Sequence, residues 1–438
     1  MAARPTLISD TIKFVTADSN TTVTATGTAY ITTPFMGILG TRQLPVIDGT
    51  TASFSKATIP SGASAGSNYE LAVMLDVTGS MCDDGVGPCT TGTKIDGLKQ
   101  AAKDLINIVV SADQTVHTSR VALVPFSTRI RVGPDGGGGA LMKTLTNLDA
   151  TKTFWYNNCI QSSGSGGSEN AGNWVCYKYQ ATKAPNWKVM PCVSERFYNA
   201  GWSFDLTDDA PGPGKWLNAH DGTRNLVGAD SSNAGPDSGS GNSASDPSGN
   251  WNYSPDGACA DTLSGNDIQP LTSTKKTLTD RIDALQSFGS TSGALATSWT
   301  WYMLSPQWAS IWTGGSQPGP YSDLTQIQAN GSPKLRKVAI LMTDGGFDSY
   351  RSWKDQDQQV VSNYATDVCS AMKKKGIEIY TVGFAIDKLP VTQQPIALAT
   401  LKACGTDLSH FYQTYTVSDL QTAFQSIGVS LGGLRLTQ

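Results

Sequence analysis

The sequence is short of charge and of histidine, and both shortages narrow the range of functions. Charged residues make up 16% of the 438 residues, against a typical share of about 25%. The net charge is −4 and no basic block occurs, so a nucleic-acid partner held through its phosphates is not expected. Three histidines, His117, His220 and His410, supply a Cys/His metal site poorly and show no matching motif of a serine hydrolase.

Long apolar runs and an export signal are also missing. No stretch approaches the roughly 20 apolar residues of a membrane helix, and residues 1–5 do not begin a signal-peptide core. The cysteines form no close CxxC pair, which disfavours zinc fingers and redox motifs. Four disulfides in an oxidising compartment fit better. Because an oxidised protein without an export signal is contradictory, we expect the natural protein to extend beyond residue 1 at its amino end.

The spacing of the eight cysteines predicts two disulfides and leaves two open. In chain order they are Cys82, Cys89, Cys159, Cys176, Cys192, Cys259, Cys369 and Cys404. The first two would close a short loop, and the last two would tie a helix to a later turn. The middle four could pair in three ways, of which the pairing of neighbours along the chain is favoured.

Composition and periodicity divide the chain into four segments. Residues 1–66 alternate Thr, Val and Ala, which predicts an N-terminal β-rich segment. Residues 67–130 and 267–438 alternate short apolar runs, typical of strands buried on both faces, with helical patterns. They predict one α/β domain with a doubly wound, mostly parallel, Rossmann-like sheet. Residues 131–266 break the alternation and are predicted to be an insertion stapled by disulfides.

Within the α/β domain the patterns place individual elements. Buried strands are expected at residues 71–75, 121–124, 338–342 and 377–384. Helices are expected at residues 95–109, 278–285, 293–304, 360–375 and 420–431. Residues 231–252 of the insertion contain no Val, Ile, Leu, Met or Phe, so this stretch is predicted to be a long loop.

Three polar segments lie where such a sheet would bring them together. Asp76, Thr78 and Ser80 directly follow the first buried strand, Asp344 follows a later one, and Thr291 precedes a helix. The carboxyl ends of parallel strands share one edge of a sheet, where ligands bind, so we expect these loops to converge. Carboxylate and hydroxyl oxygens suit a hard cation, Mg²⁺ in the first place, with Mn²⁺ or Ca²⁺ as alternatives.

The expected coordination leaves room for a partner. Ser80 and Thr291 would bind Mg²⁺ directly, and Thr78 directly or through water. Asp76 and Asp344 would act through water, orienting it by hydrogen bonds. One coordination position would remain for a carboxylate of another molecule, which would turn the metal site into a non-enzymatic binding site.

These residues resemble the metal-ion-dependent adhesion site of von Willebrand factor A-type domains. That pattern is Asp-x-Ser-x-Ser, a distant Thr and a distant Thr-Asp-Gly. Here Thr78 stands in place of the first Ser and keeps the hydroxyl. The resemblance implies an A-type fold that holds one divalent cation and binds a protein carboxylate. Asp83 and Asp84 resemble the acidic pair that joins an adjacent Ca²⁺ site in integrin β-subunit domains, although a solvated acidic turn is the simpler interpretation.

Further segments resemble the TadG family of Tad/Flp pilus-assembly proteins. They are residues 121–127, 192–196, 268–272, 299–306 and 434–436. This resemblance implies an extracytoplasmic protein of the bacterial envelope, anchored by an N-terminal membrane helix that is absent from this sequence. Pilus assembly or surface attachment, with pilus or surface components as partners, is the implied function.

Two other functions compete with an adhesion module. The first is a structural envelope protein whose metal only stabilises the fold. The second is a phosphohydrolase with Asp76 as nucleophile, since Asp76 to Ser80 also look like the phosphorylation motif of P-type pumps. The transmembrane helices of a pump are missing, and Thr78 stands where soluble relatives carry a second Asp.

The insertion offers weaker candidates for binding. Its acidic residues could bind Ca²⁺, but their spacing matches no Ca²⁺ loop, which favours a solvated loop. They are Asp205, Asp208, Asp209 and Asp221. Its tryptophans could form a ligand surface or, more commonly, the small core of a disulfide-rich insertion. They include Trp174, Trp187, Trp202 and Trp216.

Overall fold

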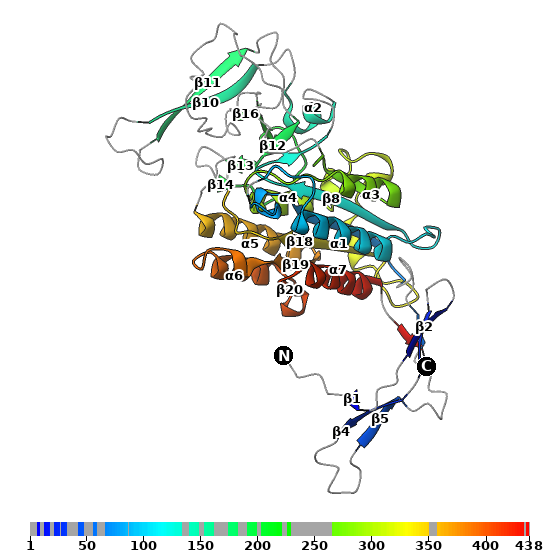
Figure 1. Cartoon of the computed structure of the whole chain (residues 1–438). Coiled ribbons are helices and arrows are strands. Elements are labelled where there is room, and N and C mark those ends of the chain that lie inside the picture. Colours follow the sequence, from blue (N-terminus) through cyan, green and yellow to red (C-terminus); the bar gives the residue numbers. More distant parts are fainter. Residues whose placement is uncertain are drawn as a thin grey trace.

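The computed structural model describes residues 66–85, 87–133, 140–148, 191–198, 203–220, 265–349 and 357–432, together with short strand segments elsewhere. Its centre is a six-stranded sheet of order β17-β8-β7-β18-β19-β20 (Figure 1). In that order the strands are Gln269–Thr272, Ser119–Phe126, Asn68–Asp76, Leu335–Thr343, Glu378–Phe384 and Phe411–Thr414. All neighbours are parallel except β17 and β8, so the predicted mostly parallel α/β sheet is confirmed.

The central strands are apolar on both sides because helices cover both faces of the sheet. In β7, Leu71, Val73 and Leu75 belong to the core on one face, whereas Ala72 and Met74 belong to the core on the other. All five are at most 2% exposed. This arrangement explains why the strands read as continuous apolar runs and not as alternating ones.

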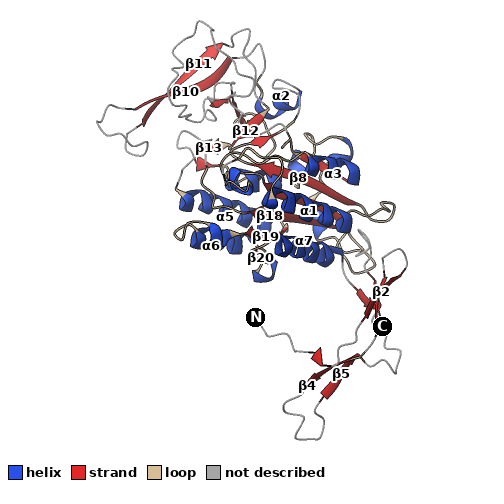
Figure 2. Cartoon of the chain, viewed as in Figure 1, coloured by secondary structure: helices blue, strands red, loops and turns tan. Residues whose placement is uncertain are grey.

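The helices divide between the two faces (Figure 2). On one face lie α1 (Thr93–Val109), α3 (Lys275–Asp283) and α7 (Val417–Gly432). On the other lie α4 (Gly293–Tyr302) and α5 (Gln358–Lys374), with α6 (Gln394–Cys404) beside α5. The five expected helices are confirmed to within a few residues. The sequence pattern does not predict α6, because its short stretch begins with proline at its second residue and carries apolar side chains on several sides.

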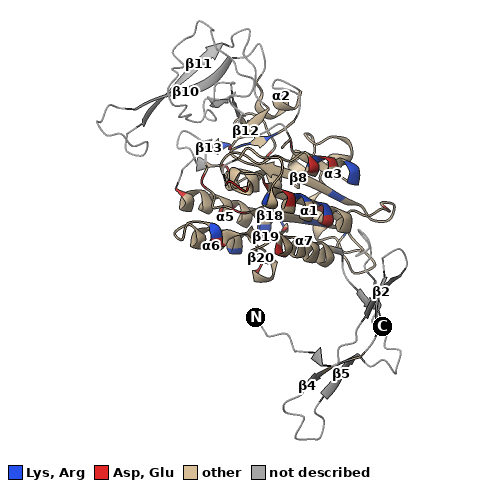
Figure 3. Ribbon diagram, in the orientation of Figure 1, with Lys and Arg blue, Asp and Glu red and all other residues tan. Residues whose placement is uncertain are grey.

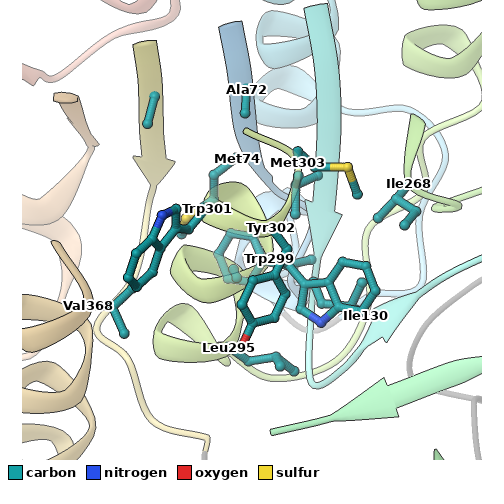
Figure 4. Close-up of a cluster of buried hydrophobic side chains, with 14 of the residues drawn as sticks. Ala72, Met74, Ile130, Ile268, Leu295, Trp299, Trp301, Tyr302, Met303 and Val368 are labelled. Carbon is teal, nitrogen blue, oxygen red and sulfur yellow. The ribbon is translucent and has the colours of Figure 1, made fainter. Parts of the chain in front are cut away.

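Helix α4 is unusual because each of its residues is buried. A helix that is apolar all round has to be covered on every side. The sheet covers one side of α4. Aromatic side chains that follow the helix in the chain cover another side. Figure 4 shows Trp299, Trp301 and Tyr302 of α4 among core side chains from the strands and from α5. Trp308 stacks on Tyr302, with ring centroids 4.4 Å apart.

Residues between β8 and α3 contribute a second, antiparallel sheet of order β11-β10-β16-β15-β12-β9. Its strands in chain order are Ile130–Arg131, Thr153–Gln161, Trp174–Thr182, Cys192–Ser194, Asn218–His220 and Leu226–Gly228. Helix α2 (Ala140–Thr146) and the pair β13 (Phe197–Tyr198) and β14 (Ser203–Phe204) lie nearby. The β10–β11 hairpin lies at the opposite end of the molecule from the N-terminal strands (Figure 1). The segment boundaries given above stay a prediction.

The N-terminal strands form two small sheets, and a strand from the other end of the chain joins one of them. The sheets have the orders β1-β4-β5 and β2-β3-β6-β21. The strands are Leu7–Ile8, Lys13–Ala17, Thr22–Thr26, Ala29–Thr32, Gln43–Ile47 and Lys56–Thr58 for β1 to β6, and Arg435–Thr437 for β21. The pairing of β21 with β6 brings strands from the two ends of the chain together. No helix of the described residues is long and apolar enough to cross a bilayer.

The two predicted local disulfides are confirmed. Cys82 is bonded to Cys89 in the loop after β7, and Cys369 of α5 is bonded to Cys404 at the end of α6. The first holds the turn that follows Ser80, and the second fastens two helices on the same face of the sheet.

The other predicted disulfides are not decided. The register of β10 and β11 places Cys159 opposite Cys176, but their side chains lie outside the described residues. Cys192 is disulfide-bonded, and its predicted partner Cys259 also lies outside them. These two pairings stay predictions.

Candidate metal centre

The strand order reverses between β7 and β18. From β7 the chain continues through α1 to β8 on one side, whereas β18 leads through α5 to β19 on the other. Ligands of open parallel sheets bind at such a reversal, outside the carboxyl ends of the strands. Asp76 is the last residue of β7, and Asp344 directly follows β18. Both predicted carboxylates therefore lie at the reversal.

Two hydroxyl groups bridge these carboxylates. Thr78 Oγ1 donates to Asp76 Oδ1 at 2.6 Å, and Ser80 Oγ donates to Asp344 Oδ1 at 2.5 Å. The two hydroxyl oxygens are 2.9 Å apart. A hydroxyl has a single proton, so none remains between these oxygens when both donate to the carboxylates. Lone pairs then face each other, an arrangement that a cation would stabilise.

Asp76 is completely buried, and both of its oxygens are held. Oδ1 also accepts from Thr78 N at 2.9 Å, and Oδ2 accepts from Thr343 Oγ1 at 2.7 Å. Burial and the nearby negative charge of Asp344 raise the pKa of Asp76 to about 7, against the opposing effect of the hydrogen bonds from Thr78 and Thr343. Ionisation of Asp76 beside Asp344 is therefore disfavoured unless positive charge is added, which favours binding of a cation.

The loop that carries Thr291 closes onto the other two. Gly79 N donates to Gly289 O at 2.8 Å, and Thr291 N donates to Asp348 Oδ1 at 2.8 Å. A β-carbon at Gly345 would lie 3.4 Å from Thr291 Oγ1 and 3.9 Å from Ser80 Oγ. The absence of a side chain at Gly345 therefore allows the two hydroxyls to approach the same point, so all five predicted ligand residues come together.

An aromatic ring fixes the Asp344 loop on α4. A β-carbon at Gly293, the first residue of α4, would lie only 2.0 Å from the ring of Phe347. The ring of Phe347 therefore lies directly against the backbone of Gly293. Gly293 is two residues after Thr291, and Phe347 is three residues after Asp344. This contact couples the positions of two of the three loops.

Lys94 is a charged member of the centre that the motifs do not reveal. Its Nζ donates to Asp344 Oδ2 at 2.8 Å and to Ser80 O at 3.1 Å. It is the second residue of α1, where the helix dipole disfavours a cation. A lysine in the first turn of the helix that follows the Asp76 motif is the one signal in the sequence that could have pointed to it.

The acidic pair beyond Ser80 serves the local backbone. Asp83 Oδ1 accepts from Thr93 N at 2.8 Å, at the start of α1, and Asp84 Oδ1 accepts from Gly87 N at 3.0 Å. Both contacts fit the simpler interpretation of an acidic turn. An adjacent Ca²⁺ site stays a prediction.

The acidic residues of the insertion are drawn into its packing. Asp205 forms ion pairs with Arg196 and Lys215, and Asp208 Oδ2 accepts from Ser305 Oγ and Tyr321 Oη. Trp216 is half-buried. Asp221, Trp187 and Trp202, and the side chain of Trp174, lie outside the described residues.

The residues of the centre fit a hard divalent cation. In the described part of the chain no three His, Cys, Asp or Glu side chains form a ligand group. The centre instead offers two carboxylates and three hydroxyls, the oxygen donors that Mg²⁺ prefers while it keeps some water. Asp76, Thr78, Ser80, Thr291 and Asp344 would hold such an ion, which would act as a Lewis acid toward an anionic group.

No protein-family model and no curated protein matches this sequence. Among solved structures, the chain is similar to the vWF domain of the type V pili tip protein Mfa5 from Porphyromonas gingivalis, with 10% identity, a TM-score of 0.39, and coverage of 85% of this chain and 98% of that one. It is also similar to the adhesive tip pilin GBS104 from Group B Streptococcus agalactiae, with 10% identity, a TM-score of 0.36, and coverage of 82% and 100%.

A third similar structure is proximal thread matrix protein 1 from the mussel byssus, with a zinc-occupied metal-ion-dependent adhesion motif. The identity is 12% and the TM-score 0.33, and the match covers 83% of this chain and 48% of that one. The chain thus spans about half of the length of that relative.

Proposed function

We propose that this chain is a non-enzymatic, metal-dependent adhesion module of the von Willebrand factor A type, which binds one divalent cation, Mg²⁺ in the first place. The observation that carries the proposal is the pair of buried carboxylates, Asp76 and Asp344, joined through the neighbouring hydroxyls of Thr78 and Ser80. Such a centre has more oxygen acceptors than protons. A cation satisfies the surplus.

The ligand of the bound ion would be a carboxylate of a protein partner. A side-chain carboxylate is a hard, anionic donor that can replace a metal-bound water. The chain segments that resemble TadG proteins favour a pilus or surface component as that partner. They also favour the bacterial envelope, outside the cytoplasm, as the location, with a membrane anchor in the natural protein.

Catalysis by Asp76 is less well supported. Each carboxylate oxygen of Asp76 accepts hydrogen bonds from two groups, Thr78 N and Oγ1 on one side and Thr343 Oγ1 and Asp344 N on the other. The side chain is also shielded from solvent. A nucleophile has to contact the substrate directly, whereas Asp76 can hold a cation through water bound to that cation.

Calorimetric titration of chelator-stripped protein with Mg²⁺ tests the metal site. We expect saturable binding of one ion, which is lost in Asp76→Ala because a carboxylate is removed. In Thr291→Ala we expect affinity to fall by about tenfold or more, and in the matched variant Thr291→Ser, which keeps the hydroxyl, to stay within about threefold. Absence of Mg²⁺ and Mn²⁺ binding in the unmodified protein would contradict the proposal.

A second measurement separates an adhesion module from a structural metal. Mn²⁺ bound with an open position accelerates the relaxation of water protons, and a carboxylate that displaces the bound water reduces that effect. We expect acetate to reduce it in the Mn²⁺-loaded protein and neutral acetamide to leave it unchanged. A purely stabilising metal would be insensitive to both.

A further inference from the structure

We propose that Lys94 sets the charge of the loaded centre, so that the site selects an anionic ligand at the expense of metal affinity. This inference rests on the proposed function and assigns a specificity-determining role to a residue outside the motif. It makes two predictions of opposite sign. Without the Lys94 charge, the centre should bind the metal more tightly and the carboxylate more weakly.

The contacts of Lys94 place its ammonium beside the centre, where it contacts neither the Ser80 hydroxyl nor the Asp344 oxygen that accepts from that hydroxyl. Lys94 Nζ contacts Asp344 Oδ2, whereas Asp344 Oδ1 faces Ser80 Oγ. A second contact, to Ser80 O, holds the ammonium beside the same loop. The side chain of Lys94 is 27% exposed and that of Asp344 is fully covered, so the interaction is only partly screened by water.

Formal charges show what this ammonium changes. The ionised carboxylates of Asp76 and Asp344 give −2, and Lys94 brings the sum to −1. A divalent cation then brings the loaded centre to +1, and one partner carboxylate brings it to neutrality. Without Lys94 the loaded centre would be neutral, and the complex with the carboxylate would carry an unpaired negative charge at a poorly solvated site, which is unfavourable.

Other charges near the centre do not alter this comparison. Asp348 is held by Thr291 N, Asp83 by Thr93 N, and Asp96 by Gly92 N. These three carboxylates are present whether or not Lys94 is charged. The protein with the Lys94 charge and the protein without it therefore differ by one unit of positive charge beside the Asp344 carboxylate.

The position of Lys94 in its helix supports a specific role. The first turn of α1 lies at the positive end of the helix dipole, which disfavours an ammonium. Asp96 in the same turn is the side chain that this end favours, and α1 as a whole carries residues of both signs (Figure 3). Lys94 overcomes that disadvantage through its contact with a buried carboxylate.

Lys94→Met and Lys94→Gln test the inference. Both remove the charge, and the Gln variant keeps an N–H donor for Asp344. The matched control is Lys103→Met on the same helix, where Lys103 forms an exposed ion pair with Asp283, about 13 Å further along the helix axis. Calorimetry with Mg²⁺ gives the metal affinity, and the water-proton relaxation of Mn²⁺-loaded protein titrated with acetate gives the carboxylate affinity.

We expect both Lys94 variants to bind Mg²⁺ about tenfold more tightly and acetate about tenfold more weakly, as one unit charge at this range can produce. Lys103→Met should stay within about twofold in both measurements.

The inference is overturned if both affinities of the folded Lys94→Gln variant match those of the unmodified protein, or if both weaken together, which would make Lys94 a support for Asp344. Circular dichroism establishes that the variants are folded. Failure of the proposed function has a different signature, since no variant would then bind Mg²⁺ or Mn²⁺ at all.

Discussion

Individual side chains at the two edges of the sheet carry out different tasks. At the carboxyl edge, hydroxyl and carboxylate oxygens lie close together, and Thr78 and Ser80 supply fewer hydroxyl protons than there are oxygen acceptors. At the amino edge, charges are paired. Glu378 at the start of β19 forms an ion pair with Arg336 at 2.6 Å and accepts from Tyr380 Oη at 2.9 Å, with His410 Nε2 at 3.2 Å. The first edge is suited to binding and the second to stability.

Glu378 is the residue for which a pH dependence of stability can be predicted. Burial raises the pKa of Glu378, but the Arg336 charge and the hydrogen bonds from Arg336, Tyr380 and His410 outweigh it, so the pKa is lowered. A carboxyl whose pKa is depressed by folding contributes stability above its unfolded value, about 4.3. That contribution is lost as the pH falls through the folded value.

We therefore expect Glu378→Gln to lower the free energy of unfolding by about 1–3 kcal/mol near neutral pH. The difference from the unmodified protein should shrink below about pH 4. Urea unfolding between about pH 7 and pH 3 checks this. Asp280→Asn, in the exposed Lys276–Asp280 pair, is the control and should change stability by no more than about 0.5 kcal/mol. A Glu378 effect of equal size at both ends of the range would contradict the explanation.

At the scale of elements, two disulfides act on different parts of the domain. The Cys369–Cys404 bond joins α5 and α6 across a separation of 35 residues, whereas Cys82–Cys89 closes a separation of 7. Cys82 lies two residues after Ser80. The first residue of α5 is at the end of the helix nearer Asp344. Cys369 is the twelfth residue of α5 and therefore lies about 17 Å further along the helix, away from Asp344.

We expect the paired replacement of Cys369 and Cys404 by serine to lower the free energy of unfolding by about 2–4 kcal/mol. Mg²⁺ affinity should stay within about twofold, because the lost bond is remote from the centre. The paired replacement of Cys82 and Cys89 should lower the free energy of unfolding less than that of Cys369 and Cys404 does, since a shorter closed loop constrains the unfolded chain less. It should weaken Mg²⁺ binding more, because Cys82 lies two residues after Ser80. Denaturant unfolding measures the free energy of unfolding, and calorimetry measures the Mg²⁺ affinity. The explanation would be refuted if loss of Cys82–Cys89 affected mainly stability and loss of Cys369–Cys404 affected mainly Mg²⁺ binding.

At the scale of the whole molecule, a buried arginine fastens the insertion to α4. Arg196 is 3% exposed and donates from Nη2 to Tyr302 Oη at 3.1 Å and from Nη1 to the carbonyls of Asp209 and Lys215. It also forms an ion pair with Asp205. The guanidinium lies over the ring of Tyr302, 4.9 Å from its centre. The insertion thereby covers the outer side of a helix that would otherwise expose apolar surface.

Arg196→Met should lower the free energy of unfolding by about 3–5 kcal/mol, because the buried carboxylate of Asp205 loses the nearer of its two cationic partners. The double variant Arg196→Met with Asp205→Asn removes both charges and should recover part of that loss. Calorimetric unfolding of the three proteins checks the order. A double variant that is no more stable than Arg196→Met would show that packing over Tyr302, and not charge, is what matters.

Much of the α/β domain could be predicted because its signals are local. The runs Leu71 to Leu75 and Val338 to Met342 are strands because both faces are apolar, and the five expected helices follow from spacing of apolar residues. Helix α6 and the edge strands β17 and β20 lack such a pattern. The second sheet was also beyond prediction, since its short strands become stable only by pairing across long loops.

The sequence by itself determined the chemistry of the candidate centre: carboxylates and hydroxyls at Asp76, Thr78, Ser80, Thr291 and Asp344, each placed next to a strand end or a helix start. Only the tertiary structure decided which groups share the centre with them. Lys94 reaches Asp344 because the first turn of α1 lies beside the loop after β18, Thr343 reaches Asp76 because β18 pairs with β7, and Gly293 admits the ring of Phe347. These contacts join residues far apart in the chain, and no local pattern specifies them, since their energy exists only once the strands and helices are packed.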